Sequence, residues 1–359
     1  MMLKPDWERN VRRVEPYIPG EQPKERNVVK LNTNENPYPP APAVQEILSG
    51  FDCDELRLYP DPDSAVLVNA IAEFYGVKPS QVFVGVGSDD VLSMAFMTFF
   101  NSGSPLLFPD ITYSFYDVWA EVYRIPYQRI PLRSDYTIDP EDYLIENGGI
   151  IFPNPNAPTG ILESTDTVEQ IVSSNPDSVV IVDEAYIDFA GDSGKASCLP
   201  LIEKYDNLLV VQTFSKSRSM AGIRIGYAIG SEKLIKYMND VKFSVNSYTM
   251  NRITQLCGAA ALSDREYFTE TVDKIIVTRE LAKKRLAELG FTFTDSRSNF
   301  IFAEHRSVPA ENIFKALKEK SIFVRWWSDP KISSRLRITV GTPEEMDRFF
   351  AALEEIVNG

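Results

Sequence analysis

The segment TFSKSRSMAGIRIGY (residues 213–227) sets one lysine among hydroxyl groups, with arginines close behind. Lys216 is that lysine, and Arg224 stands where the chain returns to an apolar run. A lysine amine held in a crevice has a lowered pKa and can form a Schiff base with a carbonyl carbon. Most lysines simply lie in solvent, so this segment alone leaves both interpretations open.

A second group of reactive side chains, Asp183 and Tyr186, follows the apolar run VVIV (residues 179–182). A carboxylate at the buried end of an apolar strand is costly unless a cation faces it. The alternative is a loop aspartate that caps a helix, and the segment by itself does not separate the two.

Two turns add backbone chemistry. GVGS (residues 85–88) places two glycines and a serine at a strand-to-helix turn, where free N–H groups can hold a phosphate. The third glycine of the dinucleotide fingerprint is missing, since Asp90 occupies its place, and a plain turn with Ser88 as helix cap fits equally well. PNPNAPTG (residues 153–160) is a rigid, proline-rich loop after another apolar run.

The elements that position these groups alternate between short apolar strands and helices from about residue 64. Strands apolar on both faces indicate a mostly parallel sheet covered on both sides, the α/β class. Ligands in such sheets bind beyond the C-terminal ends of the strands. Each of the four polar segments described above directly follows an expected strand, so all four are expected at that edge. The expected strands are 81–85, 106–108, 149–152, 179–182, 208–212 and 225–229.

The remaining chain predicts a second, smaller unit. A helix near 274–289, strands near 291–294, 300–303, 323–327 and 336–340, and helices over 310–320 and 343–357 form an α+β domain. The first forty residues are proline-rich and irregular. We expect an arm at 1–40 that packs with the small domain, a large domain at 41–252, and the small domain at 253–359.

Composition excludes several classes of protein. The 359 residues carry a formal net charge of −14, which argues against nucleic-acid or membrane-surface binding. A single histidine, His305, allows no histidine-rich metal site, and we expect a structural role for it and no metal. Cys53, Cys198 and Cys257 form no CxxC pair and predict reduced packing thiols; with no signal peptide visible, the expected location is the cytoplasm.

In their order along the chain, Asp183-x-x-Tyr186, Ser215-Lys216, Arg224 and PNAPTG resemble the fold-type-I aminotransferases that use pyridoxal phosphate. The nearest resemblance is to the histidinol-phosphate aminotransferase family. It includes EPYIPG (15–20), LNTNENPYPP (31–40), YPDP (59–62), TYSFY (112–116), FVRWW (323–327) and LRITVGT (336–342). It covers nearly the whole chain. It implies interconversion of histidinol phosphate and 2-oxoglutarate with imidazole-acetol phosphate and glutamate, a step of histidine biosynthesis.

The resemblance also implies roles for single residues. Lys216 would carry the cofactor covalently and shuttle the substrate proton, Asp183 would keep the pyridine nitrogen protonated, and Tyr186 would bond the phenolic oxygen. Further cofactor contacts are implied for Ser88, Asp89, Tyr113, Asn156, Thr213, Ser215 and Arg224. Tyr59 would reach the phosphate from a neighbouring subunit, which implies a homodimer with shared active sites.

The substrates implied are small molecules: an amino acid, a phosphorylated amine and a 2-oxo acid. Arg337 would bind the carboxylate or phosphate, because an arginine fork accepts either anion. Arg325 and Tyr17 are expected to take the extra phosphate charge or the distal group, and Asn34, Asn36 and Asn299 to line the site. An exposed strand arginine paired with an acid is the alternative for Arg337.

Two positions depart from the family pattern. Ala157 stands where the family usually has an asparagine that hydrogen-bonds the cofactor's phenolic oxygen. Three alternatives follow: Tyr186 alone holds this oxygen, Asn156 or a water replaces the missing hydrogen bond, or the cofactor's electronics change. Ser217 and Arg218 replace small or aromatic residues, and we expect Arg218 to add a cation near the pocket mouth.

Other functions share some of these motifs. A threonine-phosphate decarboxylase or an aromatic amino-acid aminotransferase needs the same lysine and differs in substrate. A Rossmann-type oxidoreductase could use Gly85-Val86-Gly87, although the third glycine is missing. A non-catalytic binding domain would hold no covalent cofactor at all.

Overall fold

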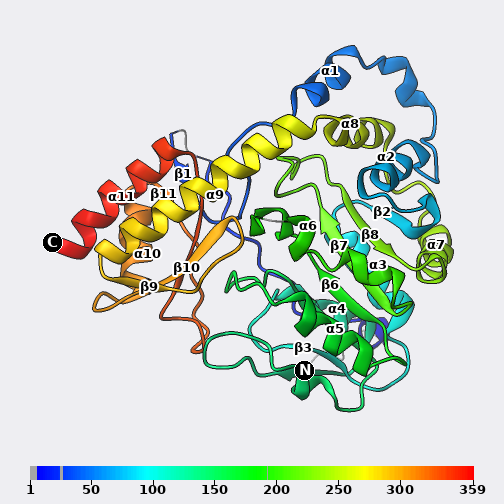
Figure 1. Ribbon diagram of the computed structural model, residues 1–359, viewed down its shortest axis with the longest axis horizontal. Helices are drawn as coiled ribbons and strands as arrows, with labels where there is room; N and C mark the ends of the chain where they lie inside the picture. The colour runs from blue at the N-terminus through cyan, green and yellow to red at the C-terminus, as the bar shows by residue number, and fades with distance from the viewer. Residues whose placement is uncertain (1–5, 25–26, 192) are drawn as a thin grey trace.

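The computed structural model describes residues 6–24, 27–191 and 193–359. Of the expected arm, residues 1–5 and 25–26 therefore lie outside the described residues. The chain forms a larger unit around one wide sheet and a smaller unit beside it (Figure 1).

The wide sheet has seven strands, and all but one of them run parallel. The exception is β8, antiparallel to both of its neighbours. In spatial order the strands are β2 (Val82–Gly85), β8 (Gly226–Gly230), β7 (Leu208–Thr213), β6 (Val180–Asp183), β5 (Gly149–Pro153), β3 (Leu106–Pro109) and β4 (Tyr127–Ile130). The mostly parallel α/β sheet expected from the apolar runs is confirmed.

Helices cover both faces of this sheet, as alternate strand residues require. In β6, Val180 and Val182 pack into one core and Ile181 into the other. The first core is covered by α1 (Pro42–Gly50), α2 (Ala65–Tyr75), α5 (Thr165–Ser174) and α8 (Arg252–Ser263). The second is covered by α3 (Ser88–Phe99), α4 (Phe115–Tyr123) and α7 (Glu232–Val245). The connections hold α6 (Ser193–Ala196) and the 3₁₀ turns η1 (Asp6–Asn10), η2 (Cys53–Arg57), η3 (Pro79–Gln81), η4 (Pro140–Tyr143), η5 (Ile187–Ala190) and η6 (Leu199–Glu203).

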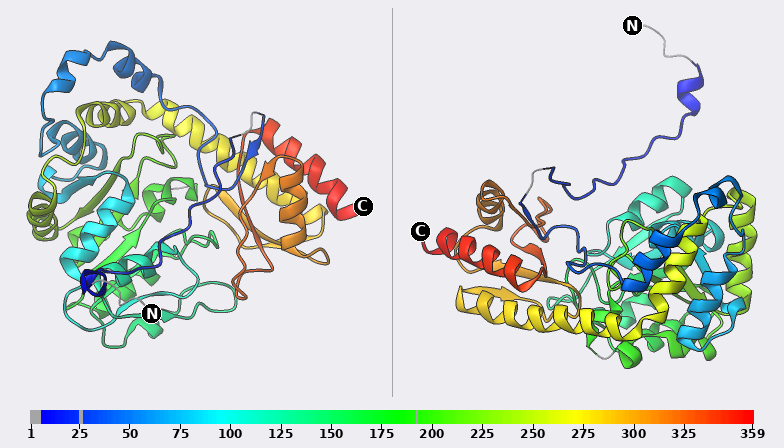
Figure 2. Two further views of the ribbon diagram at one scale, coloured as in Figure 1. Left: turned by 180° about the vertical axis from the view of Figure 1, so that it is seen from behind. Right: turned by 90° about the horizontal axis from the view of Figure 1, so that it is seen from above.

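The smaller unit is an antiparallel sheet covered by helices. Its strands are β9 (Phe291–Phe293), β10 (Phe300–His305) and β12 (Leu336–Thr339), and its helices are α9 (Arg265–Glu288), α10 (Ala310–Glu319) and α11 (Pro343–Asn358). The arm joins it through β1 (Val29–Lys30), which pairs in parallel with β11 (Ile322–Phe323). Figure 2 shows the arm leaving the body of the molecule toward its N-terminal end.

Two expectations need correction. Helix α9 begins at Arg265 and not near Lys274, because the Asp264 side chain accepts the Tyr267 N–H and caps the helix there. The expected boundary at residue 253 does not match the packing either, since Cys257 and Ala261 of α8 belong to the core of the wide sheet. We therefore propose that α9 connects the two domains.

Candidate active site

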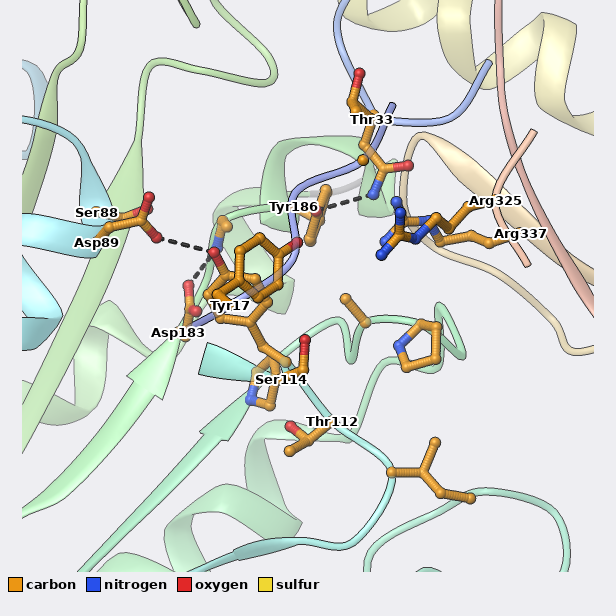
Figure 3. A pocket seen from close by; sticks show the side chains of 18 of the residues that line it. Tyr17, Thr33, Ser88, Asp89, Thr112, Ser114, Asp183, Tyr186, Arg325 and Arg337 are labelled. Atoms are coloured by element: carbon orange, nitrogen blue, oxygen red, sulfur yellow. Dashed lines mark hydrogen bonds between the residues drawn. The ribbon is translucent and has the colours of Figure 1, made fainter. Parts of the chain in front are cut away.

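A cleft of about 350 Å³ opens where β3, β5, β6 and β7 end, between the two domains and the arm. The large domain supplies its floor, and the small domain supplies two arginines. Figure 3 shows Ser88, Asp89 and Asp183 toward one end and Arg325 and Arg337 together at the other. The expected residues that line it are Tyr17, Asn34, Ser88, Asp89, Tyr113, Asp183, Tyr186, Thr213, Ser215, Lys216, Arg224, Arg325 and Arg337.

One end of the cleft is suited to an anion. Helix α3 begins at Ser88, so its unpaired N–H groups and positive dipole end face the cleft. Gly87 has φ +89°, and a Cβ there would lie 2.3 Å from Nη2 of Arg224. Only glycine lets the guanidinium come this close to the turn. Nη2 of Arg224 lies 3.4 Å from an oxygen of Asp89, a long contact on exposed side chains.

The Asp183 carboxyl marks the deep end. It is 5% exposed and accepts hydrogen bonds from the Tyr116 hydroxyl (3.1 Å) and the Ala185 N–H (3.2 Å). Burial raises the pKa of Asp183 to about 6, against the lowering effect of those two donors. Among the described residues no lysine or arginine pairs with it, so the site can accept a cationic group from a ligand.

The next acid along the chain faces elsewhere. Glu184 accepts the Cys198 N–H (2.6 Å), the Ser197 hydroxyl (2.7 Å) and the Gln212 side-chain amide (2.8 Å). Burial raises the pKa of Glu184 to about 7. It is absent from the cleft lining, so Asp183 alone of this acidic pair can meet a ligand there.

Lys216 follows β7 with its amine in the cleft. Its Nζ donates to the Thr33 carbonyl of the arm (3.1 Å) and lies 5.7 Å from the centre of the Tyr186 ring. The described acids form no ion pair with it. A partly buried amine held by one carbonyl is available to a carbonyl compound that enters the cleft.

Tyr186 connects the floor to the arm and the small domain. Its Oη accepts a hydrogen bond from Nδ2 of Asn34 (3.0 Å), and Oδ1 of Asn34 accepts one from the Thr339 hydroxyl (3.0 Å). The Tyr186 ring meets Phe300 edge to face at 5.2 Å. The phenol is therefore held from two sides, at its oxygen and at its ring.

The other end of the cleft carries two positive charges. Arg325 and Arg337 pair in an isolated antiparallel bridge, with backbone N–H to carbonyl distances of 3.0 and 2.9 Å. Nη2 of Arg337 donates to the Asn32 carbonyl (2.9 Å), while its buried Nε has no partner among the described residues. Burial lowers the pKa of Arg337, and Arg325 lowers it further. The acid pairing considered as an alternative for Arg337 is absent from the part of the chain that the structure describes.

An aromatic wall of the cleft runs alongside. The Tyr17 ring stacks on Phe115 at 4.3 Å and lies 6.4 Å from the Tyr113 ring. The Tyr113 hydroxyl donates to Asp89 (2.9 Å), and burial raises its pKa. The arm thus brings Tyr17 to the cleft, against the aromatic side chains of the large domain.

Four of the expected residues are absent from the cleft lining. One of them, Asn299, is fully buried, and its Nδ2 donates to the Asn34 carbonyl (3.0 Å). Nδ2 of Asn156 donates to the Ile111 carbonyl and to Thr159 (both 3.0 Å), so this amide ties its own loop together. Asn36 donates to the Ser217 carbonyl (3.1 Å) and accepts the Tyr38 N–H (3.0 Å). Tyr59 is 78% exposed and stacks on Tyr248 at 4.6 Å, away from the cleft of its own chain.

Other expectations are also settled. Arg218 adds no cation to the pocket mouth: it is 7% exposed, and its guanidinium lies 4.0 Å from the centre of the Phe268 ring. Cys198 and Cys257 are buried, whereas Cys53 is exposed and packs in no core. His305 is structural, with one ring nitrogen 3.0 Å from the Leu289 carbonyl and the other accepting the Val308 N–H.

Sequence reasoning missed two parts of the site. The Thr33 carbonyl that holds Lys216 is a backbone atom and leaves no mark in the sequence. The other is Trp327, whose ring centre lies 5.3 Å from the guanidinium of each arginine. Its place in FVRWW, two residues after Arg325, is the signal that could have found it.

Within the described residues, no group of acids, cysteines and histidine could hold a metal ion, and no helix is long and apolar enough to cross a membrane.

The family Aminotransferase class I and II matches residues 26–353. A histidinol-phosphate aminotransferase of Lactococcus lactis subsp. cremoris is 52% identical over 349 residues, covering 97% of each chain. That of Brachyspira hyodysenteriae is 50% identical over 344 residues, covering 96% of each. The crystal structure of histidinol-phosphate aminotransferase from Sinorhizobium meliloti in complex with pyridoxal-5'-phosphate superposes with a TM-score of 0.84 at 25% identity. It covers 92% of this chain and 90% of that one.

Proposed function

The chain belongs to the histidinol-phosphate aminotransferases of the class I and II aminotransferase family, and we propose the site through which it acts. It is a pyridoxal-phosphate-dependent enzyme that interconverts histidinol phosphate and 2-oxoglutarate with imidazole-acetol phosphate and glutamate. The reaction is a step of histidine biosynthesis.

The cleft fits pyridoxal phosphate at three separate points. The Gly87 turn, the α3 N-terminus and Arg224 form a cradle for the phosphate, and a single Cβ at Gly87 would fill it. The unpaired Asp183 carboxyl suits a protonated ring nitrogen, because a cation there relieves the cost of burying the carboxylate. The Lys216 amine lies in the same cleft for covalent attachment.

With the cofactor bound, side chains of this protein would transfer or hold the protons that the reaction needs. Pyridoxal phosphate supplies an electron-accepting ring that stabilises negative charge on the substrate carbon. With the cofactor bound, the Lys216 amine would take the proton from the carbon that bears the amino group and deliver it to the cofactor's aldehyde carbon. The Asp183 carboxylate would hold a proton at the ring nitrogen, and the Tyr186 hydroxyl would donate to the phenolic oxygen. Thr213 and Ser215, bonded to one another at 3.0 Å, line the phosphate end with Ser88 and Asp89.

The substrate assignment rests on the paired arginines. Arg325 and Arg337 present two adjacent positive charges, and no described acid neutralises either of them. A phosphate monoester dianion matches a double cation better than a single carboxylate does, and guanidinium groups bind both anions in a forked geometry. Tyr17 closes the same region against Phe115 and Tyr113, where it meets the distal ring of the substrate.

The exposed Tyr59 serves the cofactor phosphate of a second copy, which makes the enzyme a homodimer with shared active sites. The reaction takes place in the cytoplasm, in keeping with three cysteines that form no disulfide.

Amino-group transfer from alternative donors tests the function. The purified chain, loaded with pyridoxal phosphate and 2-oxoglutarate, is mixed with histidinol phosphate, phenylalanine or threonine phosphate, and glutamate and carbon dioxide are measured. We expect glutamate from histidinol phosphate at a kcat/KM well above that for phenylalanine. A higher kcat/KM for phenylalanine than for histidinol phosphate would indicate an aromatic aminotransferase. Release of carbon dioxide from threonine phosphate would indicate the decarboxylase.

A further inference from the structure

The hydrogen bonds behind Tyr186 form a short directional chain. The backbone N–H of Asn34 donates to Oγ1 of Thr339 (3.0 Å), and the Thr339 hydroxyl donates back to Oδ1 of Asn34 (3.0 Å). Nδ2 of Asn34 then donates to Oη of Tyr186 (3.0 Å). The Asn34 carbonyl accepts a further bond from Asn299 (3.0 Å), so this residue is held at its backbone and at its side chain.

This series of hydrogen bonds fixes which way the Tyr186 hydroxyl points. The Thr339 hydroxyl hydrogen is directed at Oδ1 of Asn34, which leaves the amide N–H groups to face Tyr186. Oη of Tyr186 is therefore an acceptor toward Asn34, and its own hydrogen is free to donate into the cleft that Tyr186 lines. In Figure 3 the hydrogen bond that Tyr186 accepts from Asn34 is drawn as a dashed line at Tyr186.

Neither position 156 nor position 157 offers an amide in place of Asn34. Ala157 lines the cleft with a methyl group, and the amide of Asn156 is occupied by the Ile111 carbonyl and Thr159. The Asn34 backbone has φ +56°, a left-handed conformation that asparagine and aspartate adopt more readily than other side chains. Asn34 thus combines the backbone conformation and the amide that this position requires.

We propose that Asn34 is a positioning residue that makes Tyr186 an obligatory hydrogen-bond donor toward the cofactor's phenolic oxygen. The inference rests on the cofactor binding proposed above and deepens it. Asn34 touches no reacting atom, and it acts by accepting a bond from Thr339 and donating one to Tyr186. Because β12 carries Thr339, the small domain helps to set the proton arrangement at the cofactor.

The test is the pH titration of the visible absorbance of the bound cofactor. A hydroxyl that donates to the phenolic oxygen favours its deprotonated form. Loss of this donor raises the pKa of the spectral change by about one unit, the typical effect of one hydrogen bond to a charged group. Asn34→Asp keeps the shape and the backbone preference, but its carboxylate attracts the Tyr186 hydrogen away from the cofactor. We expect a shift of about one unit, close to that of Tyr186→Phe.

The control is the double variant in the Tyr186→Phe background. There Asn34→Asp retains only the effect of its added charge and is expected to shift the pKa by less than about half as much. Equal shifts in both backgrounds, or no shift in the parent chain, would overturn the inference. Thr339→Val adds no charge and gives a second test. If this variant raises the pKa of the spectral change when Tyr186 is present, by less than Asn34→Asp does, the result supports the inference. An unchanged pKa counts against the inference. A parent chain without any visible band would instead contradict the proposed cofactor binding.

Discussion

Arg325 and Arg337 lie opposite one another in an antiparallel bridge, and each guanidinium is 5.3 Å from the ring centre of Trp327. Directly opposed residues in such a pair project from the same face, so two like charges are held side by side. The electron-rich ring of Trp327 offsets part of their repulsion. We propose that an anion entering between them relieves the rest, so that this end of the cleft favours doubly charged groups.

Substitutions at the two arginines should therefore have unequal effects. Arg337→Lys loses the forked geometry, and we expect kcat/KM to fall by about 100-fold or more for histidinol phosphate and for glutamate alike. Arg325→Ala removes the second charge, and we expect a loss of about tenfold that falls mainly on histidinol phosphate. Steady-state kinetics with both donors measure this. An Arg325→Ala enzyme that loses the two activities equally would refute the assignment of this residue to the phosphate.

The Gly87 turn gives a prediction about cofactor affinity. Gly87→Ala would place a Cβ 2.3 Å from Nη2 of Arg224, in a backbone conformation that alanine rarely adopts. Displacing the guanidinium weakens a charge-assisted contact to phosphate, and we expect the Kd for pyridoxal phosphate to rise by about tenfold or more. Gly222→Ala is the matched control, because a Cβ added there would meet no other atom within 4 Å. Titration of the apo-chain with cofactor compares the two, and equal affinities would contradict the cradle.

Asp183 predicts a pH dependence of stability in the cofactor-free chain. Burial raises its folded-state pKa from 3.8 to about 6. Between these values the folded chain binds a proton that the unfolded chain releases, so this group costs stability increasingly as pH rises through that window. Asp183→Asn lacks this cost, and its unfolding free energy should exceed that of the parent most at high pH.

The measurement is denaturant unfolding of both apo-chains at several pH values. We expect the difference between the variant and the parent to shrink by about 1 kcal/mol from pH 7 to pH 5. The contribution of Glu184 is common to both chains and cancels. A difference that stays constant over this range would show that Asp183 titrates normally in the folded chain.

Shared active sites can be tested by mixing two inactive variants. In a hybrid of Lys216→Ala and Tyr59→Ala subunits, one site carries both changes and the other carries neither. Free exchange of equal amounts should restore about a quarter of the parent activity if Tyr59 acts across the interface. Size-exclusion chromatography confirms that hybrids form. If both residues served the same subunit's site, every site would stay damaged and no activity would return.

The sequence predicted those parts of the molecule that depend on repeating patterns. Apolar runs such as 179–182 and 208–212 became adjacent parallel strands, and the polar groups after them meet at one edge. Lys216 and Asp183 lie in one cleft because parallel strands end on the same side of the sheet. The family followed from the order of the motifs along the chain, which requires no knowledge of how they pack.

What the sequence could not predict was the direction of individual side chains. Asn156 and Asn36 stand in loops, and single backbone partners at Ile111 and Ser217 turn their amides away from the cleft. Arg218 sits two residues after Lys216, yet the ring of Phe268 draws its guanidinium into the interior. Such contacts join residues far apart in the chain, and no local pattern records them.

The most direct test of the proposed activity is a single half-reaction. The chain loaded with pyridoxal phosphate is mixed with histidinol phosphate alone, and visible absorbance and released imidazole-acetol phosphate are followed together. We predict that the visible band disappears with one equivalent of product per Lys216, that 2-oxoglutarate restores it, and that Lys216→Ala shows neither change. A band that persists in the parent chain with histidinol phosphate, while another amine removes it, would contradict the central claim.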